Sequence, residues 1–510
     1  MVWTSRIGAG LVTGLAAILT IRSLRWPLVH DGPLLHYIAA RILDGAAPYR
    51  DLFDMNFPGV YLVHVLALRL FGAGDAGFRA FDLTLLGLIA VGLFLIVAPY
   101  GRAAGVLAAA LFWLYHVAGG PWRTAQRDLI LCLPLAAAAI ASLSYARTGR
   151  GLALGVAGLA LGSAAWIKPH ALVLAPLVAA LAWRPPGGHR DADRAARLLT
   201  LAVGCLVTAV PVLVWLGMTQ SLGAFWDIVG GYLVPLYSRL GRDLFWPMLW
   251  LEVGPWVLAG LGLWALFGLI ALRRSGAASG ETAILGAGAA YGVLHVLLQG
   301  KGWGYHLYPL ALFAIALGAA GLGTAARAGR RGLAVALVGA LGLTVTGVWA
   351  KGVPNLDPDW IAAASARTQA VAQTLRPVVA AGGTVEVLDT NAGGIHALFL
   401  LGARQPTRFL YDFHFYHDAG HPYVDRLRRE LLDELRAAEP TAVVLFQRGW
   451  PHGGYDRLAG FPALEEWLRA GYRQSAEGDG YRVFERKAVA AGDGRAGTAG
   501  ARPGPATPSG

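Results

Sequence analysis

The chain has 510 residues, of which 56% are hydrophobic and only 15% charged, and its formal net charge is +12. Soluble proteins contain about 45–50% apolar and about 25% charged residues. So few charges cannot cover the surface of a soluble globule, which excludes a wholly soluble protein, and the high apolar content excludes a disordered chain. The composition therefore predicts an α-helical polytopic membrane protein.

Apolar runs long enough to cross a bilayer recur through residues 1–350. A helix needs roughly 20 apolar residues to span a hydrocarbon core of ~30 Å, and about eleven runs approach this length. The first run follows Arg6 and lacks a small-residue cleavage site, which predicts an uncleaved anchor. The predicted spans are 7–28, 80–98, 104–118, 128–146, 151–167, 170–183, 198–217, 246–272, 281–299, 305–325 and 332–349.

Arginines in the connecting loops predict the orientation of the bundle. With the N-terminus inside, every inside loop is basic, as the positive-inside rule requires. This holds only if 58–72 does not cross; the run is short and contains His64 and Arg69, so we expect a helix lying on the outer surface. Charge placed in short loops also argues against a nucleic-acid partner. The inside arginines are Arg102, Arg147, Arg150, Arg184, Arg190, Arg194, Arg197, Arg273, Arg274, Arg327, Arg330 and Arg331.

The chain divides into three parts. We predict a transmembrane domain at 1–350 with a long first outer loop at 29–79, an extracytoplasmic α/β domain at 351–487, and a disordered Gly/Ala/Pro/Ser-rich tail at 488–510. The expected location is the cell inner (plasma) membrane, with many passes. The predicted strands of the α/β domain are 384–390, 407–411, 441–446 and 481–486, and its predicted helices are 360–377, 422–438 and 455–470.

Two pairs of glycines have the G-x-x-x-G spacing, Gly158 with Gly162 and Gly288 with Gly292. Small residues at this spacing let two helix backbones approach closely in a membrane. We therefore predict helix-packing surfaces at these positions rather than functional sites.

Ionisable residues gather at the predicted outer ends of the helices. Such residues are costly in a membrane, so their placement is informative. A carboxylate can act as general base on an acceptor hydroxyl, and cationic side chains can stabilise a phosphate leaving group. The residues alone therefore predict chemistry on a lipid-borne phosphate at the outer leaflet. The group comprises Asp31, Asp51, Asp54, Arg123, Arg127, Asp128, Lys168, Lys301, His306 and Lys351.

Four segments carry a family pattern. Within 30–72, an aspartate just after the first helix is followed by an aromatic-containing helix, by G-x-x-P-Y-x-D-x-x-D and by a proline. Together with RTAQRDLILCLP (123–134), WIKPHALVLAP (166–176) and GKGWGYHLYPL (300–310), this pattern resembles the GT-C superfamily of membrane glycosyltransferases. The resembling branch contains the bacterial relatives of protein O-mannosyltransferases and of the lipid A aminoarabinose transferase. The resemblance covers roughly 1–350.

The resemblance implies transfer of a sugar from a polyprenyl-phosphate donor to a lipid, glycan or protein acceptor at the outer face, with inversion. It implies that Asp31 is the general base or acceptor-orienting carboxylate and that Asp128 is the second catalytic carboxylate. The family often has a further carboxylate where this chain has Gly32, so a divalent cation stays an open expectation and no metal ligand is assigned. The implied substrate-binding residues are Tyr37, Asp54, Arg127, Lys168, Lys301 and His306.

Structural interpretations compete for the same residues. Asp31 could cap the helix that follows it, and Asp128 could be the N-cap of the fourth span. Lys168 and Lys301 could extend toward phospholipid headgroups, and His306 could belong to an aromatic belt at the interface.

The segment 414–421 contains H-x-x-H-D-x-x-H, a spacing that could bind a metal. It could equally form a loop over the mouth of the active site.

Two other functions remain open. One is a transporter or flippase for a lipid-linked substrate, although the sequence shows neither the repeats nor the midplane charge pairs that such proteins often carry. The other is a membrane scaffold whose outer domain binds a partner.

Overall fold

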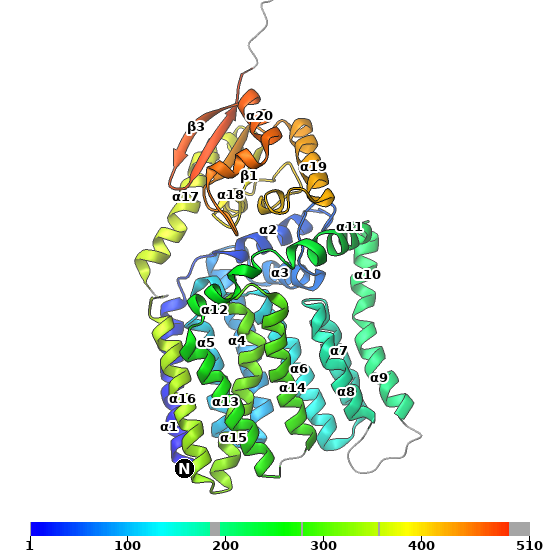
Figure 1. Cartoon of the computed structure of the whole chain (residues 1–510), viewed down its shortest axis with the longest axis vertical. Helices are drawn as coiled ribbons and strands as arrows, with labels where there is room; N and C mark the ends of the chain where they lie inside the picture. Colours follow the sequence, from blue (N-terminus) through cyan, green and yellow to red (C-terminus); the bar gives the residue numbers. More distant parts are fainter. Residues whose placement is uncertain (1, 184–193, 277–278, 355–356, 489–510) are drawn as a thin grey trace, which may run out of the picture.

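A computed structural model describes residues 2–183, 194–276, 279–354 and 357–488. Within them the protein is mainly helical, with one small sheet near the C-terminus. The helices form a bundle, and the C-terminal part covers one end of it, which we call the capped end (Figure 1). The predicted tail beyond residue 488, together with Arg184 and Arg190 of a predicted inside loop, lies outside the described residues.

Eight helices in the described part of the chain are long and apolar enough to cross a membrane, which makes the chain a multi-pass membrane protein. Three shorter apolar segments, α5 (Arg102–Val117), α7 (Gly151–Ala165) and η3–α8 (Pro169–Trp183), run beside them (Figure 1). The eight are α1 (Val2–Ser23), α4 (Asp75–Val97), α6 (Arg127–Thr148), α9 and α10 (Arg194–Val207 and Ala209–Met218), α13 (Pro255–Arg274), α14 (Ser279–Gln299), α15 (Tyr308–Arg327) and α16 (Arg331–Gly352).

Two helices, α2 (Asp31–Leu43) and α3 (Pro58–Phe71), lie across the capped end instead of along the bundle (Figure 1). At 14 residues, α3 is about 21 Å long, which is too short for a ~30 Å core. The short length and the position across the end of the bundle agree with a helix that does not cross, and its place at the outer surface stays a prediction. The turns α4–α5, α6–α7, α13–α14 and α15–α16, which carry predicted inside arginines, lie at the opposite end, where the chain begins.

The predicted span 246–272 is wrong as a single helix. The structure divides it into α12 (Phe245–Glu252) and α13, with Gly254 between them at a left-handed φ of 78°. Glycine adopts this turn without strain, and Pro255 suits the first position of a new helix but cannot continue an old one. Hydropathy alone does not detect such a break.

The predicted glycine pairs lie where helices touch. A Cβ at Gly158 or Gly162 of α7 would meet the backbone of α9 at Leu201 or Cys205. On α14, a Cβ at Gly292 would fall on the backbone of α15. These contacts confirm the packing interpretation, because only a missing side chain allows such an approach.

Gly292→Leu is expected to lower the free energy of unfolding by about 1–3 kcal/mol or more, since the new side chain must force α14 and α15 apart. A matched control is Gly262→Leu on α13, where a Cβ meets nothing within 4 Å. Heating both variants in detergent and measuring the folded fraction by size-exclusion chromatography tests this. Equal melting temperatures for the two variants would contradict the packing role of Gly292.

The C-terminal part contains a four-stranded sheet of order β1-β2-β4-β3. β1 pairs with β2 in parallel, whereas β4 pairs antiparallel with β2 and β3. Three of its strands and three of its helices match predicted segments, while β3 and α18 were not predicted. The elements are α17 (Pro358–Ala380), β1 (Val385–Leu388), α18 (Gly394–Leu401), α19 (Pro422–Ala438), β2 (Ala442–Phe446), α20 (Pro462–Gly471), β3 (Tyr472–Gly478) and β4 (Tyr481–Arg486).

The predicted strand 407–411 is wrong, because this segment does not join the sheet. It forms an isolated parallel bridge between Phe53 and Phe409, and the Phe53 N–H donates to the carbonyl of Arg408 at 2.7 Å. The rings of Phe53 and Phe409 also pack at 5.4 Å between centroids. The apolar residues that suggested a strand therefore attach the C-terminal part to the first loop.

Candidate active site

A cavity of about 520 Å³ lies at the capped end, between the bundle and the C-terminal part. Asp31 and Arg127 face it from the membrane domain, and residues 389–396 face it from the C-terminal part. A cavity of this size with a few convergent polar groups is typical of a binding site for a small molecule. Its polar and aromatic lining includes His30, Asp31, Trp122, Arg127, Tyr237, Glu252, Trp303, Tyr305, Asp389, Asn391, Tyr411 and Arg448.

Asp31 stands at the start of α2, and both of its oxygens have partners. Oδ2 accepts from Arg127 Nη2 at 2.8 Å, and Oδ1 accepts from Asn391 Nδ2 at 2.7 Å and lies 3.2 Å from His30 Nδ1. Burial by itself would raise the pKa of Asp31, but His30 and Arg127 outweigh it and hold this pKa well below its usual range. The N-cap residue of α2 is His30, so the structure does not support the capping interpretation of Asp31.

Arg127 begins α6 and joins Asp31 to residues 54–56 further along the first loop. Its Nη1 donates to Asn56 Oδ1 at 2.7 Å, and Asn56 Nδ2 donates in turn to Asp54 Oδ2 at 2.7 Å. Asp54 is fully buried, accepts from Tyr61 Oη at 2.6 Å, and does not line the cavity. The structure thus connects Asp54 to the cavity through Asn56 and Arg127.

Asp128 belongs to a separate polar cluster behind Arg127. Its Oδ1 lies 2.6 Å from His295 Nε2 and 3.9 Å from Lys168 Nζ, and His295 Nδ1 lies 2.8 Å from His170 Nε2. Gln126, not Asp128, is the N-cap residue of α6, so the capping interpretation of Asp128 is not supported. Lys168 donates inward to Gln299 at 3.1 Å instead of extending toward headgroups, and burial lowers the pKa of Lys168 to about 8.

Three further residues that were predicted to bind substrate are buried but do not line the Asp31 cavity. Lys301 donates to the carbonyl of Tyr237 at 2.8 Å and lies over the Tyr237 and Trp450 rings, both of which do line it. His306 packs against neighbouring aromatic rings and is 1% exposed. The Tyr37 hydroxyl accepts from the backbone N–H of Gln405 at 2.8 Å, so it contacts the C-terminal part.

The histidine-rich segment 414–421 makes contacts that do not involve a metal. His414 Nδ1 lies 2.7 Å from Tyr232 Oη, His417 Nδ1 lies 2.9 Å from the carbonyl of Phe413, and His421 caps α19. In the described ranges, no group of three or more His, Cys, Asp or Glu side chains is arranged to hold a metal ion.

The contact between Asn391 and Asp31 was not predicted from the sequence. Asn391 lies 360 positions from Asp31 in the sequence and has a left-handed φ of 56°. The Asp389 carboxylate holds this turn by accepting from the N–H groups of Ala392 and Gly394, each at 2.7 Å. Burial, with a contribution from Asp412, raises the pKa of Asp389 to about 6. No sequence pattern connects such distant residues.

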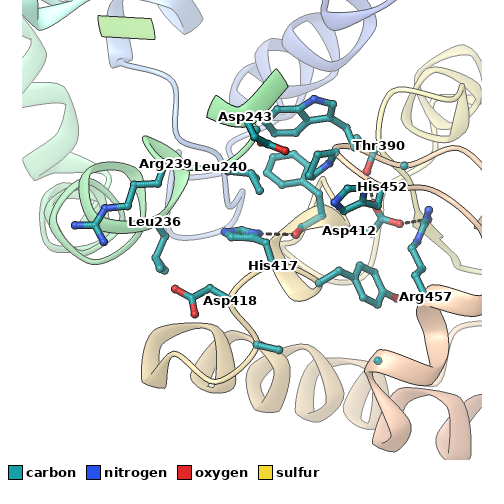
Figure 2. A pocket seen from close by; sticks show the side chains of 18 of the residues that line it. Leu236, Arg239, Leu240, Asp243, Thr390, Asp412, His417, Asp418, His452 and Arg457 are labelled. Carbon is teal, nitrogen blue, oxygen red and sulfur yellow. Dashed lines mark hydrogen bonds and ion pairs between the residues drawn. The ribbon is translucent and has the colours of Figure 1, made fainter. Parts of the chain in front are cut away.

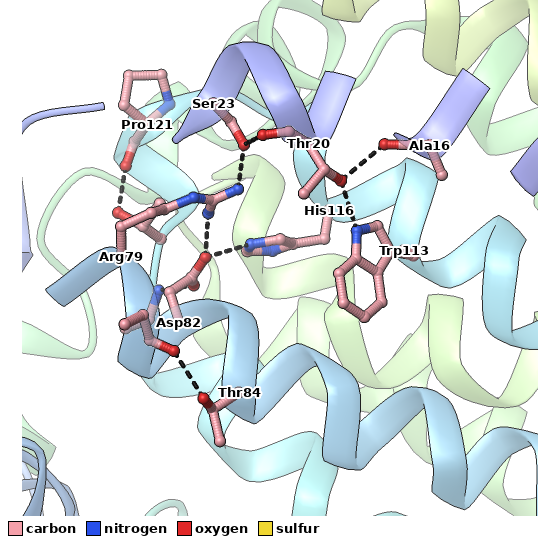
Figure 3. A network of polar contacts seen from close by, with 12 residues as sticks. Ala16, Thr20, Ser23, Arg79, Asp82, Thr84, Trp113, His116 and Pro121 are labelled. Carbon is pink, nitrogen blue, oxygen red and sulfur yellow. Dashed lines mark hydrogen bonds and ion pairs between the residues drawn. The ribbon is translucent and has the colours of Figure 1, made fainter. Parts of the chain in front are cut away.

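A buried network surrounds Asp82 (Figure 3), and it supports the loop that precedes Arg127. Asp82 on α4 accepts from the backbone N–H of Ala125 at 2.6 Å and from His116 Nε2 at 3.0 Å, and it pairs with Arg79. Arg79 also donates to Ser23 at the end of α1. Because Ala125 has a left-handed φ of 46°, the Asp82 contact holds the loop in a conformation that is otherwise unfavourable.

The fold has solved counterparts. The crystal structure of ArnT from Cupriavidus metallidurans bound to undecaprenyl phosphate superposes with a TM-score of 0.56 at 15% identity, covering 93% of this chain and 97% of that one. The chain has the fold of the GT-C membrane glycosyltransferases. A second GT-C structure, the archaeal oligosaccharyltransferase AglB from Archaeoglobus fulgidus with an inhibitory peptide and a dolichol-phosphate, matches with a TM-score of 0.54 at 12% identity, covering 94% of this chain and 74% of that one.

The family model of dolichyl-phosphate-mannose-protein mannosyltransferases matches residues 57–215, which form α3 to α10 of this GT-C fold. A comparison with curated protein sequences gave no match. The GT-C resemblance predicted from the four segments is therefore confirmed, and the family match and the fold together support a membrane glycosyltransferase.

Proposed function

We propose that the protein transfers a sugar from a polyprenyl-phosphate donor to an acceptor hydroxyl in the Asp31 cavity. The observation that carries this proposal is the Asp31–Arg127 ion pair, at 2.8 Å, in the wall of a cavity at one end of the bundle. The ArnT and AglB structures of the same fold hold undecaprenyl phosphate and dolichol-phosphate. The arginine-rich turns at the opposite end favour an extracytoplasmic position for the cavity and the C-terminal part.

In this proposal, Asp31 and Arg127 act on opposite partners of one displacement. The acceptor oxygen bonds to the anomeric carbon while the bond from that carbon to the phosphate oxygen breaks. The polyprenyl phosphate leaves with its negative charge, which Arg127 stabilises from the cavity and Lys168 from behind it. The acceptor proton passes to Asp31, and one displacement inverts the anomeric configuration.

The shared Arg127 also explains how a strongly acidic Asp31 becomes a base. In the ligand-free site, Arg127 and His30 hold the pKa of Asp31 low, so the carboxylate is a weak proton acceptor. A donor phosphate competes for the Arg127 guanidinium, and the pKa of Asp31 then rises toward its ordinary value. Donor binding therefore activates the base at the moment it is needed.

The test uses the purified full chain in lipid nanodiscs with polyprenyl-phosphate hexose and pentose donors and with lipid, glycan and peptide acceptors that carry free hydroxyls. The expected result is release of polyprenyl phosphate, together with a saccharide product. Saturable movement of the intact donor across a proteoliposome membrane, without release of polyprenyl phosphate, would instead identify a flippase.

Asn391→Gly is expected to lower kcat about 10-fold or more, because a hydrogen bond to a charged group contributes about 1.5–3 kcal/mol. Glycine keeps the left-handed backbone and removes only the amide that contacts Asp31. Steady-state rates measure the effect. The matched control is Gln220→Gly, another left-handed position, with φ 54°, on the surface. An unchanged kcat in Asn391→Gly would show that the Asn391 contact does not serve catalysis.

A further inference from the structure

A second cavity, of about 610 Å³, lies between residues 235–243 and the C-terminal part (Figure 2). Its volume falls in the range of small-molecule sites. None of the residues that line it comes from the long membrane-spanning helices of the described chain, so the cavity lies at the capped end and not between those helices. The lining residues include Leu236, Arg239, Asp243, Thr390, Asp412, Phe413, Tyr416, His417, Asp418, Arg428, Trp450, His452 and Arg457.

The second cavity adjoins the Asp31 cavity. Thr390, Phe413 and Trp450 line both cavities. At this shared lining, Thr390 donates to Asp412, which lines the second cavity, and the next residue, Asn391, donates to Asp31, which lines the other. A molecule in the second cavity therefore lies one residue away from the contact that holds Asp31.

Positively and negatively charged side chains are equal in number in the lining of the second cavity. Three arginines and three aspartates line it, and Asp412 and Arg457 pair directly with each other. Burial lowers the pKa of His417, which keeps that imidazole neutral. A phosphate or another anionic group would need an excess of positive charge, which this lining does not offer.

The lining combines aromatic faces with open polar groups. Phe413, Tyr416 and Trp450 supply apolar ring faces, on which the C–H faces of a sugar ring can pack. His417 lines the cavity, and its buried Nε2 atom has no hydrogen-bond partner in the described residues. A lining that contains both polar and aromatic groups suits a polyhydroxylated ligand.

We propose that the second cavity binds the acceptor, a neutral glycan chain, and presents one of its hydroxyls to Asp31 past Thr390 and Asn391. This proposal rests on the proposed function and names its acceptor class. The C-terminal part thereby contributes the acceptor site, whereas the membrane domain holds the donor.

Binding of neutral oligosaccharides to the full chain in nanodiscs tests the proposal. The probes are manno-, gluco-, galacto- and N-acetylglucosamine trisaccharides, observed by saturation-transfer NMR. At least one trisaccharide is expected to bind saturably. Ala419→Trp, which fills the cavity mouth without removing a polar group, should weaken that binding at least 10-fold. Ala437→Trp, on the exposed face of α19, is the matched control and should leave binding unchanged.

Two outcomes would overturn the acceptor site: no trisaccharide binds, or Ala419→Trp binds as tightly as the unaltered chain. Release of polyprenyl phosphate from the donor is measured separately on the same samples. Trisaccharide binding without donor cleavage would refute the proposed function and leave the cavity's ligand class standing. Donor cleavage without trisaccharide binding would refute the acceptor site alone.

Discussion

Asp31→Asn is expected to lower the rate of sugar transfer by about 10²–10⁴-fold, the usual contribution of a general base. The amide cannot take the acceptor proton, although it keeps the size of the side chain and its hydrogen bond from Asn391. Donor binding should persist, because Arg127 loses its carboxylate partner and remains free for phosphate. The measurement is release of polyprenyl phosphate under single-turnover conditions, with donor affinity determined in parallel.

Asp44→Asn at the C-cap of the same helix is the matched control, since Asp44 is exposed and pairs with Arg41, and neither residue lines the Asp31 cavity. Its rate should stay within twofold of that of the unaltered chain. If Asp31→Asn transferred sugar at the rate of the unaltered chain, Asp31 would not be the general base, and the mechanism proposed for the cavity would be wrong.

Asp82→Asn is expected to lower the free energy of unfolding by about 3–5 kcal/mol, because it leaves the Arg79 charge buried without its counter-charge. The Arg79 and Asp82 side chains are 3% and 0% exposed. The same substitution weakens the contact that holds Ala125, so the loop before Arg127 should also loosen. Thermal unfolding in detergent measures the stability, and the transfer rate reports on the loop.

The comparison variant is Asp227→Asn, which breaks an ion pair with Arg426 in which both side chains are more than 40% exposed. Solvent screens such pairs, and about 1 kcal/mol or less should be lost. If Asp82→Asn were no less stable than Asp227→Asn, the Asp82 network would not support the bundle.

Local composition predicted most of the membrane domain. An apolar run of bilayer length can satisfy its backbone only as a helix, so the position of most helices follows from hydropathy. The short run 58–72 with His64 and Arg69 was likewise predicted as non-crossing, and α3 lies across the end of the bundle. The prediction failed where a single backbone conformation decided the outcome, as at Gly254, since hydropathy does not record φ.

In the C-terminal part, strand prediction succeeded for β1, β2 and β4 and failed for β3 and for the segment 407–411. β1 and β2 are completely buried and rich in valine, which is a clear signal. β3 is mostly exposed and polar, so its sequence did not indicate a strand. The segment 407–411 has strand-like residues but pairs with Phe53 of the first loop, because tertiary packing overrides weak local preference.

The alternation of spans placed Asp31, Arg127 and Asp128 at one end of the bundle, because successive membrane helices return the chain to the same side. Which of these side chains touch was decided by the folded chain: Arg127 turns to Asp31, while Asp128 turns to His295. The Asn391 contact and the shared lining of the two cavities arise only when the C-terminal part docks on the first loop. The residue types of a segment predict whether it is buried. Contacts between distant segments depend on packing geometry, which no local sequence pattern encodes.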